Sequence, residues 1–126
     1  MHWATRYIGR PWSQENDCYA FFRHIQLTHF GRHLPVIDVD AMNIRTVIRT
    51  FRDHEERSRW GQVPSPMEGD AAMLGKNSTQ IHLGLWLPVD GGRVLHCDKV
   101  GGVLCQSLDS LRLNGWSHVE WYSPCN

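Results

Sequence analysis

Cys18, His82 and His96 are the residues of this chain whose types and positions fit nucleophilic catalysis. Cys18 follows Asp17 in a segment that predicts the start of a helix, and both histidines lie in segments typical of strands. A helix N-terminus and a nearby imidazolium both stabilise a thiolate, so we expect the pKa of Cys18 to be low. His82 would then act as the base, and His96 would orient it.

Each of these residues also has a structural interpretation. A cysteine on the apolar face of a helix usually packs in the core. A single histidine in a strand is more often a hydrogen-bonded polar group than a catalytic one. Trp12 and Trp86 would be ordinary core or rim aromatics. The catalytic interpretation therefore depends on the three residues occurring together.

The N-terminal half of the sequence predicts two helices. Asn16 or Asp17 can cap the first helix, and Gly31 can end it. One buried face of that helix is predicted by apolar spacing of i, i+3, i+4 and i+7, at Cys18, Phe21, Phe22 and Ile25. The second helix is expected from about Ala41 to about Glu56, and a connecting loop should follow it, marked by Gly61, Pro64, Pro66 and Gly69.

The C-terminal half predicts strands. Leucines at 83, 85 and 87 alternate with His82, Gly84 and Trp86, which is typical of a strand. The expected elements of this half are strands at Ala71–Leu74, Ile81–Leu87, Arg93–Cys97, Val103–Cys105 and His118–Tyr122, with one helical turn at Leu108–Leu113.

The hairpin between the second and third of these strands should bring the two histidines together. His82 and His96 are 14 positions apart, an even number, with the turn near their midpoint. Facing residues of a hairpin share a face of the sheet. We therefore expect the two imidazoles on one face, and Leu83, Leu95 and Cys97 on the other, toward a core.

Composition limits the classes of function. The 126 residues fit one domain, and 41% of them are hydrophobic, enough for a core. Lysine plus arginine number 13, as do aspartate plus glutamate, which argues against nucleic acid as the main partner. No Cys-x-x-Cys spacing, no apparent signal peptide and no long apolar run occur. We expect reduced cysteines, synthesis in a cytoplasm and no insertion into membranes.

Six segments, in order along the chain, resemble the motifs of the NlpC-type cell-wall peptidases, a branch of the papain-like cysteine peptidases. The family's nucleophile motif is Asp-Cys-Ser-Gly-Leu/Phe-Val, and its base lies in His-Val-Gly-Ile-Tyr. The corresponding segments here are Asp17-Cys18-Tyr19-Ala20-Phe21-Phe22, Gly31-Arg32-His33-Leu34-Pro35, Gly69-Asp70, His82-Leu83-Gly84-Leu85-Trp86, Val94-Leu95-His96-Cys97 and Gly102-Val103. The resemblance spans roughly residues 7 to 122.

The resemblance implies a fold and a catalytic triad. The fold is α+β and papain-like, with an N-terminal helical half packed on a small antiparallel sheet in a single domain, residues 1–126. Cys18 is the implied nucleophile, His82 the base and His96 the orienting residue. The implied substrate is a peptidoglycan stem peptide, and no cofactor or metal is implied.

The resemblance also implies residues on the substrate side of the site. Trp12 stands where many members place a substrate-facing tyrosine, and Tyr19 replaces the small serine that usually follows the nucleophile. With Asp17, these are the expected substrate-binding residues. Small stand-alone members with Leu-Pro after the first helix are similar to those encoded in phage tail gene clusters. The implied place is therefore a virion tail, with other tail proteins as partners and a role in cell-wall penetration.

Two other interpretations remain open. The domain could be a structural tail-tip component with a vestigial or weakly active site, which Tyr19 and the short segment between Trp12 and Cys18 favour. The eight histidines could instead form a metal-binding domain. Four tryptophans have no place in the expected site, and we expect at least one of them in an exposed apolar patch; they are Trp3, Trp60, Trp116 and Trp121.

Overall fold

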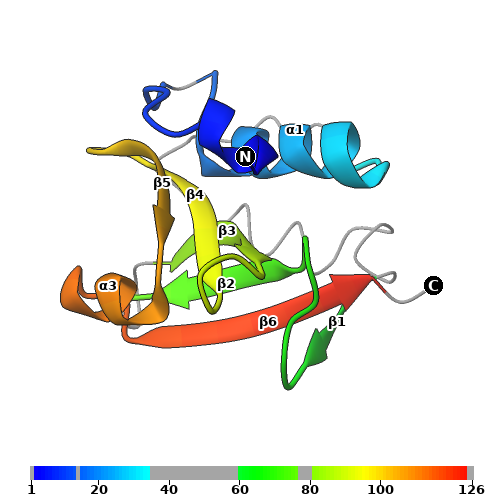
Figure 1. The fold of residues 1–126 in the computed structure, drawn as a ribbon, viewed down its shortest axis with the longest axis vertical. Coiled ribbons are helices and arrows are strands. Elements are labelled where there is room, and N and C mark those ends of the chain that lie inside the picture. The colour runs from blue at the N-terminus through cyan, green and yellow to red at the C-terminus, as the bar shows by residue number, and fades with distance from the viewer. Residues whose placement is uncertain (1, 14, 35–59, 77–80, 125–126) are drawn as a thin grey trace.

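A six-stranded antiparallel sheet is the centre of the fold, which is a small α+β domain (Figure 1). The computed structural model describes residues 2–13, 15–34, 60–76 and 81–124. Its strands are β1 Trp60–Val63, β2 Ala71–Gly75, β3 Ile81–Leu87, β4 Arg93–Asp98, β5 Gly102–Gln106 and β6 His118–Pro124, in the order β1-β6-β2-β3-β4-β5. The helices are a 3₁₀ helix at Trp3–Arg6, α1 at Cys18–Phe30 and α3 at Leu108–Leu113.

The two faces of the sheet are packed by different elements. Helix α1 lies across one face (Figure 1), and the leucines that alternate along β3 point toward it. The other face carries a smaller apolar cluster with α3. That cluster consists of Ala72, Leu74, Val94 and Leu111, with Leu108, Trp116, Val119 and Trp121 packed against it. Side chains at neighbouring positions along one strand therefore pack on opposite faces of the sheet.

The first predicted helix is confirmed as α1. The Asp17 carboxylate accepts a hydrogen bond from the Ala20 N–H at 2.9 Å, which caps the N-terminus. Gly31 ends the helix in the left-handed region, with φ +65°. The predicted apolar face is buried at all four of its positions, Cys18, Phe21, Phe22 and Ile25. The second predicted helix, 41–56, lies outside the described residues.

The strands of the C-terminal half and the short helix are confirmed, with one addition. The segment after residue 60 was expected to be loop throughout, but Trp60–Val63 forms an edge strand paired with β6. The paired residues of the two strands are 58 to 64 positions apart in the sequence, so no local alternation could reveal the pairing. Pro64 directly follows β1, as expected where a strand must stop donating hydrogen bonds.

In the β3–β4 hairpin, His82 and His96 are not directly opposite each other. His96 faces Gly84 rather than His82. The turn is centred on Asp90 and Gly91, which both have positive φ, +49° and +83°. Because the offset is two residues, His82 and His96 remain on the same face, as predicted.

Candidate functional site

The two predicted histidines lie together on the face of the sheet that α3 covers. His82 Nε2 is 2.9 Å from His96 Nδ1, a hydrogen bond between buried rings from adjacent strands. The rings meet edge to face, with centroids 4.9 Å apart. Trp116 stacks on the outer side of His82 at 5.3 Å. The predicted pairing of His82 with His96 on one face is confirmed.

Two residues that the sequence did not single out complete this cluster. His96 Nε2 is 2.8 Å from Gln106 Oε1, and the amide nitrogen of Gln106 donates to Ser110 Oγ at 3.0 Å. Gln106 ends β5 and Ser110 lies in α3. Neither residue belongs to a recognisable motif, and only the pairing of β4 with β5 brings Gln106 beside His96.

Both histidines are uncharged near neutral pH. Burial lowers the pKa of His82 to about 3, and the neighbouring His96 adds to this effect. Burial also lowers the pKa of His96, although the hydrogen bond to Gln106 and the charge of Asp98 oppose this. A cationic imidazole is therefore not available to stabilise a thiolate in the described conformation.

Cys18 is the first residue of α1, as predicted, but its thiol is not activated. Burial raises the pKa of Cys18 to about 12, although a backbone hydrogen bond from Leu83 lowers it somewhat. A helix dipole contributes at most about 2 kcal/mol, less than two pKa units. Desolvation exceeds that contribution because the side chain is only 7% exposed. The expectation of a lowered pKa is wrong for this conformation.

The sheet places Cys18 and the histidines on opposite sides. Cys18 packs with Leu83 and Cys97, whose side chains point toward α1, whereas His82 alternates to the other face. Among the residues that the structure describes, no hydrogen bond joins Cys18 to His82 or His96. The expected contact between thiol and base is therefore not made in this conformation.

The paired part of β3 and β4 ends beside Cys18, and we call this end of the pairing the β3–β4 opening. The β3–β4 pairing ends at Gly84 and His96, although β3 begins at Ile81 and β4 continues to Asp98. The Cys18 thiol contacts the backbone of Leu83, just beyond the last pair. Thiol and imidazole thus lie on either side of the point where the two strands separate.

The three expected substrate-binding residues lie in different environments. Trp12 is half-buried, and the ammonium of Lys99 lies 5.4 Å from the centre of its ring. The carboxylate of Asp17 is occupied by the helix cap. Tyr19 is only 4% exposed and packs in the core, so its contact with substrate would require a movement of the side chain and stays a prediction. The side chain of Trp12 is thus partly accessible, with Lys99 as its neighbour.

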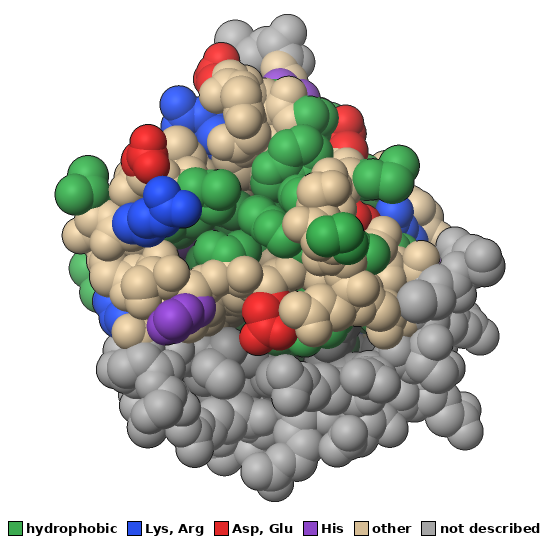
Figure 2. Space-filling model, turned by 90° about the horizontal axis from the view of Figure 1, so that it is seen from below, with side chains coloured by type: hydrophobic (Ala, Val, Ile, Leu, Met, Phe, Trp, Pro, Cys, Tyr) green, Lys and Arg blue, Asp and Glu red, His purple; other side chains and the backbone are tan. Residues whose placement is uncertain are grey.

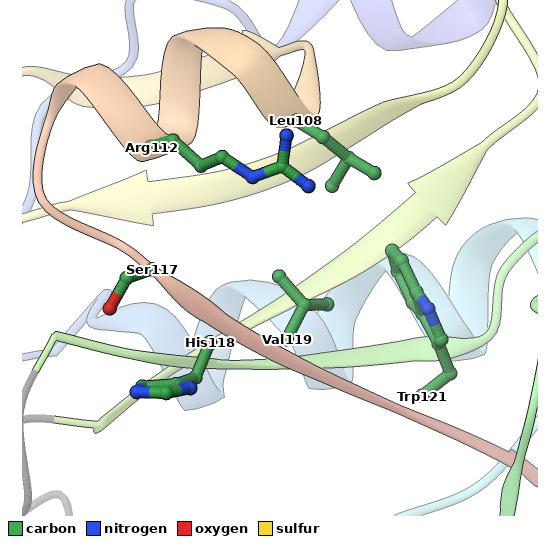
Figure 3. Close-up of a pocket in the computed structure, with 6 residues that line it drawn as sticks. All are labelled: Leu108, Arg112, Ser117, His118, Val119 and Trp121. Carbon is green, nitrogen blue, oxygen red and sulfur yellow. The ribbon is translucent and has the colours of Figure 1, made fainter.

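A pocket of about 380 Å³ opens between α3 and β6. Figure 3 shows the side chains that line it, which are Leu108, Arg112, Ser117, His118, Val119 and Trp121. Seen from this side, hydrophobic side chains gather at the centre of the surface, with charged groups around them (Figure 2). Trp121 is half-buried there, whereas Trp60 is buried in the core.

Comparison with known proteins adds no family assignment. No family model matches the chain, and no curated protein matches it. Within the described ranges, no group of three or more histidine, cysteine or acidic side chains is arranged to hold a metal ion. None of the helices in the described part of the chain is long and apolar enough to cross a membrane.

Proposed function

We propose that this chain is a cysteine peptidase of the NlpC type that hydrolyses peptidoglycan stem peptides. The observation that carries the proposal is the hydrogen bond between His82 and His96, next to the strand opening against which Cys18 lies. A helix that begins at the cysteine and covers an antiparallel sheet with both histidines on adjacent strands is the layout that the sequence motifs imply.

The mechanism begins from a neutral thiol and a neutral imidazole. His82 takes the proton of Cys18 as the sulfur attacks the peptide carbonyl, and returns it to the leaving amine. His96 holds His82 in one orientation through their 2.9 Å hydrogen bond. The backbone N–H of Cys18, at the helix start, stabilises the oxyanion. Water then releases the acyl group from the sulfur.

The reacting conformation differs from the described one in the position of the thiol. Cys18 must approach His82 at the opening between β3 and β4, where the backbone of Leu83 separates them. In the proposal, substrate binding moves the thiol toward His82. The place of action is a virion tail, where other tail proteins carry the peptidase to the cell wall.

The test is hydrolysis of purified sacculi, followed by mass analysis of the released fragments. Wild type should release stem-peptide fragments, whereas Cys18→Ala and His82→Ala should release none above background. Cys105→Ala is the matched control, because Cys105 is a half-buried thiol on β5, outside the proposed site. Unchanged fragment release by Cys18→Ala, or none by wild type, would refute the proposal.

A structural tail component with an inactive site is the second candidate. It is favoured by the protonated thiol and by the sheet that stands between Cys18 and the histidines. The pocket beside α3 and β6 would then serve contacts with neighbouring tail proteins. For this candidate, purified virions should contain the protein and should retain normal cell-wall penetration with Cys18→Ala.

A further inference from the structure

Three hydrogen bonds in series connect His82 to α3. They join His82 Nε2 to His96 Nδ1 at 2.9 Å, His96 Nε2 to Gln106 Oε1 at 2.8 Å, and Gln106 Nε2 to Ser110 Oγ at 3.0 Å. His82 and His96 are 8% and 1% exposed, so water cannot easily replace these partners.

The direction of these bonds determines where the imidazole protons lie. An amide oxygen only accepts, so His96 Nε2 must carry a proton to bond Gln106. A neutral His96 then has a bare Nδ1, which accepts from a proton on His82 Nε2. A neutral His82 consequently keeps its lone pair on Nδ1, the nitrogen not used in this series. Burial keeps both rings neutral by lowering their pKa values.

Rotating the amide of Gln106 would reverse every proton in the series. The amide nitrogen would donate to His96 Nε2, His96 would carry its proton on Nδ1, and His82 would turn its lone pair toward His96. His82 would then have no free lone pair with which to accept a proton. In the described arrangement the amide nitrogen instead bonds the Ser110 hydroxyl on α3.

We propose that Gln106 is a positioning residue that sets the tautomer of His96 and thereby places the lone pair of His82 on Nδ1. Gln106 acts through His96, because the hydrogen bonds of its side chain go to His96 and Ser110. The catalytic consequence rests on the proposed function, in which His82 is the base. The tautomers themselves are properties of the folded chain and do not depend on that function.

Long-range ¹H–¹⁵N NMR identifies the protonated nitrogen of each ring, at a pH of about 8, above the ordinary histidine pKa. Wild type should show protonated Nε2 on both His82 and His96. Gln106→Glu supplies a group that, when ionised, only accepts, so it should leave both tautomers as in wild type. Protonated Nδ1 on His82 in wild type, or a change of tautomer in Gln106→Glu, overturns the proposal.

Gln106→Leu removes the acceptor and should give mixed tautomers at both rings. Gln62→Leu is the matched control, because Gln62 is an exposed strand glutamine on β1. It should leave the histidine signals unchanged. If Gln106→Leu fails to fold, wild type and Gln106→Glu still decide the question.

Kinetics on sacculi separate this proposal from the proposed function. Because the buried His96 ring loses its hydrogen-bond partner, Gln106→Leu should lower kcat by about 5- to 150-fold with little change in KM, and Gln106→Glu should retain more activity. An inactive wild type with the expected tautomers refutes the peptidase and leaves the role of Gln106 in setting the tautomers. An active wild type with reversed tautomers refutes the role of Gln106 alone.

Discussion

Cys18 should react slowly with thiol reagents in the free protein, although it begins a helix. Raising its pKa from 9.0 to about 12 lowers the thiolate fraction at neutral pH about 1000-fold. The remaining thiolate is intrinsically more nucleophilic, by about 20-fold for a Brønsted coefficient near 0.45. The net expectation is a rate about 50-fold below that of an ordinary thiol, before the 7% exposure of the side chain slows it further.

The assay is exchange with a small disulfide reagent at about pH 7.5, on native and on urea-unfolded protein. The four cysteines fall on separate tryptic peptides, so mass spectrometry reads each rate independently. Cys105, which is half-buried, should label faster than Cys18 and Cys97 in the native protein. A native rate for Cys18 within fivefold of its unfolded rate would refute the reasoning, because it would require an ordinary or lowered pKa.

Three further outcomes follow from the same contacts. Asp17→Ala should lose the helix cap, and urea unfolding should show a loss of about 1 kcal/mol of stability. Asp17→Asn should keep the cap. Because it removes a charge that raises the pKa of Cys18, it should also speed the labelling of that thiol. Gly84→Ala should destabilise by about 1–3 kcal/mol, because its Cβ would lie 2.7 Å from a valine methyl, whereas the control Gly75→Ala meets nothing closer than 3.4 Å. Stability should fall by about 1.4 kcal/mol per pH unit between about pH 6.5 and 3 from His82 alone, since unfolding lets it bind a proton, and His82→Gln should flatten that slope.

Local signals predicted the elements of the fold, and long-range pairing supplied the rest. Helix α1 could be read from the sequence because its cap, its apolar spacing and its terminal Gly31 all lie within the segment itself. The bounds of β3 were predicted from the alternation of leucines with polar residues. The strand β1 was missed because its pattern is short and its partner is distant. Strand order across the sheet has no sequence signal of this local kind.

The residues of the candidate site also divide into those that local spacing predicted and those that long-range pairing places. An even spacing around a turn was enough to place His82 and His96 on one face, because the side-chain period of a strand is two. It was not enough to place Cys18, since the start of a helix says nothing about which face of the sheet that helix covers. Gln106 was missed because its role comes from the neighbouring strand and from a helix that follows it.

The Cys18 thiol and the imidazoles of His82 and His96 are all uncharged in the folded protein near neutral pH. A thiolate buried beside α1 would need a cation, and the buried histidines on the far face remain neutral. A neutral thiol and neutral imidazoles therefore place no charge at Cys18, His82 or His96, and this avoids the free-energy cost of burying a charge there. Catalysis from that state requires proton transfer as the bond to the carbonyl forms, rather than a pre-formed ion pair. The access of Cys18 to His82 at the β3–β4 opening, rather than the pKa of the free thiol, would then control the rate of the proposed peptidase.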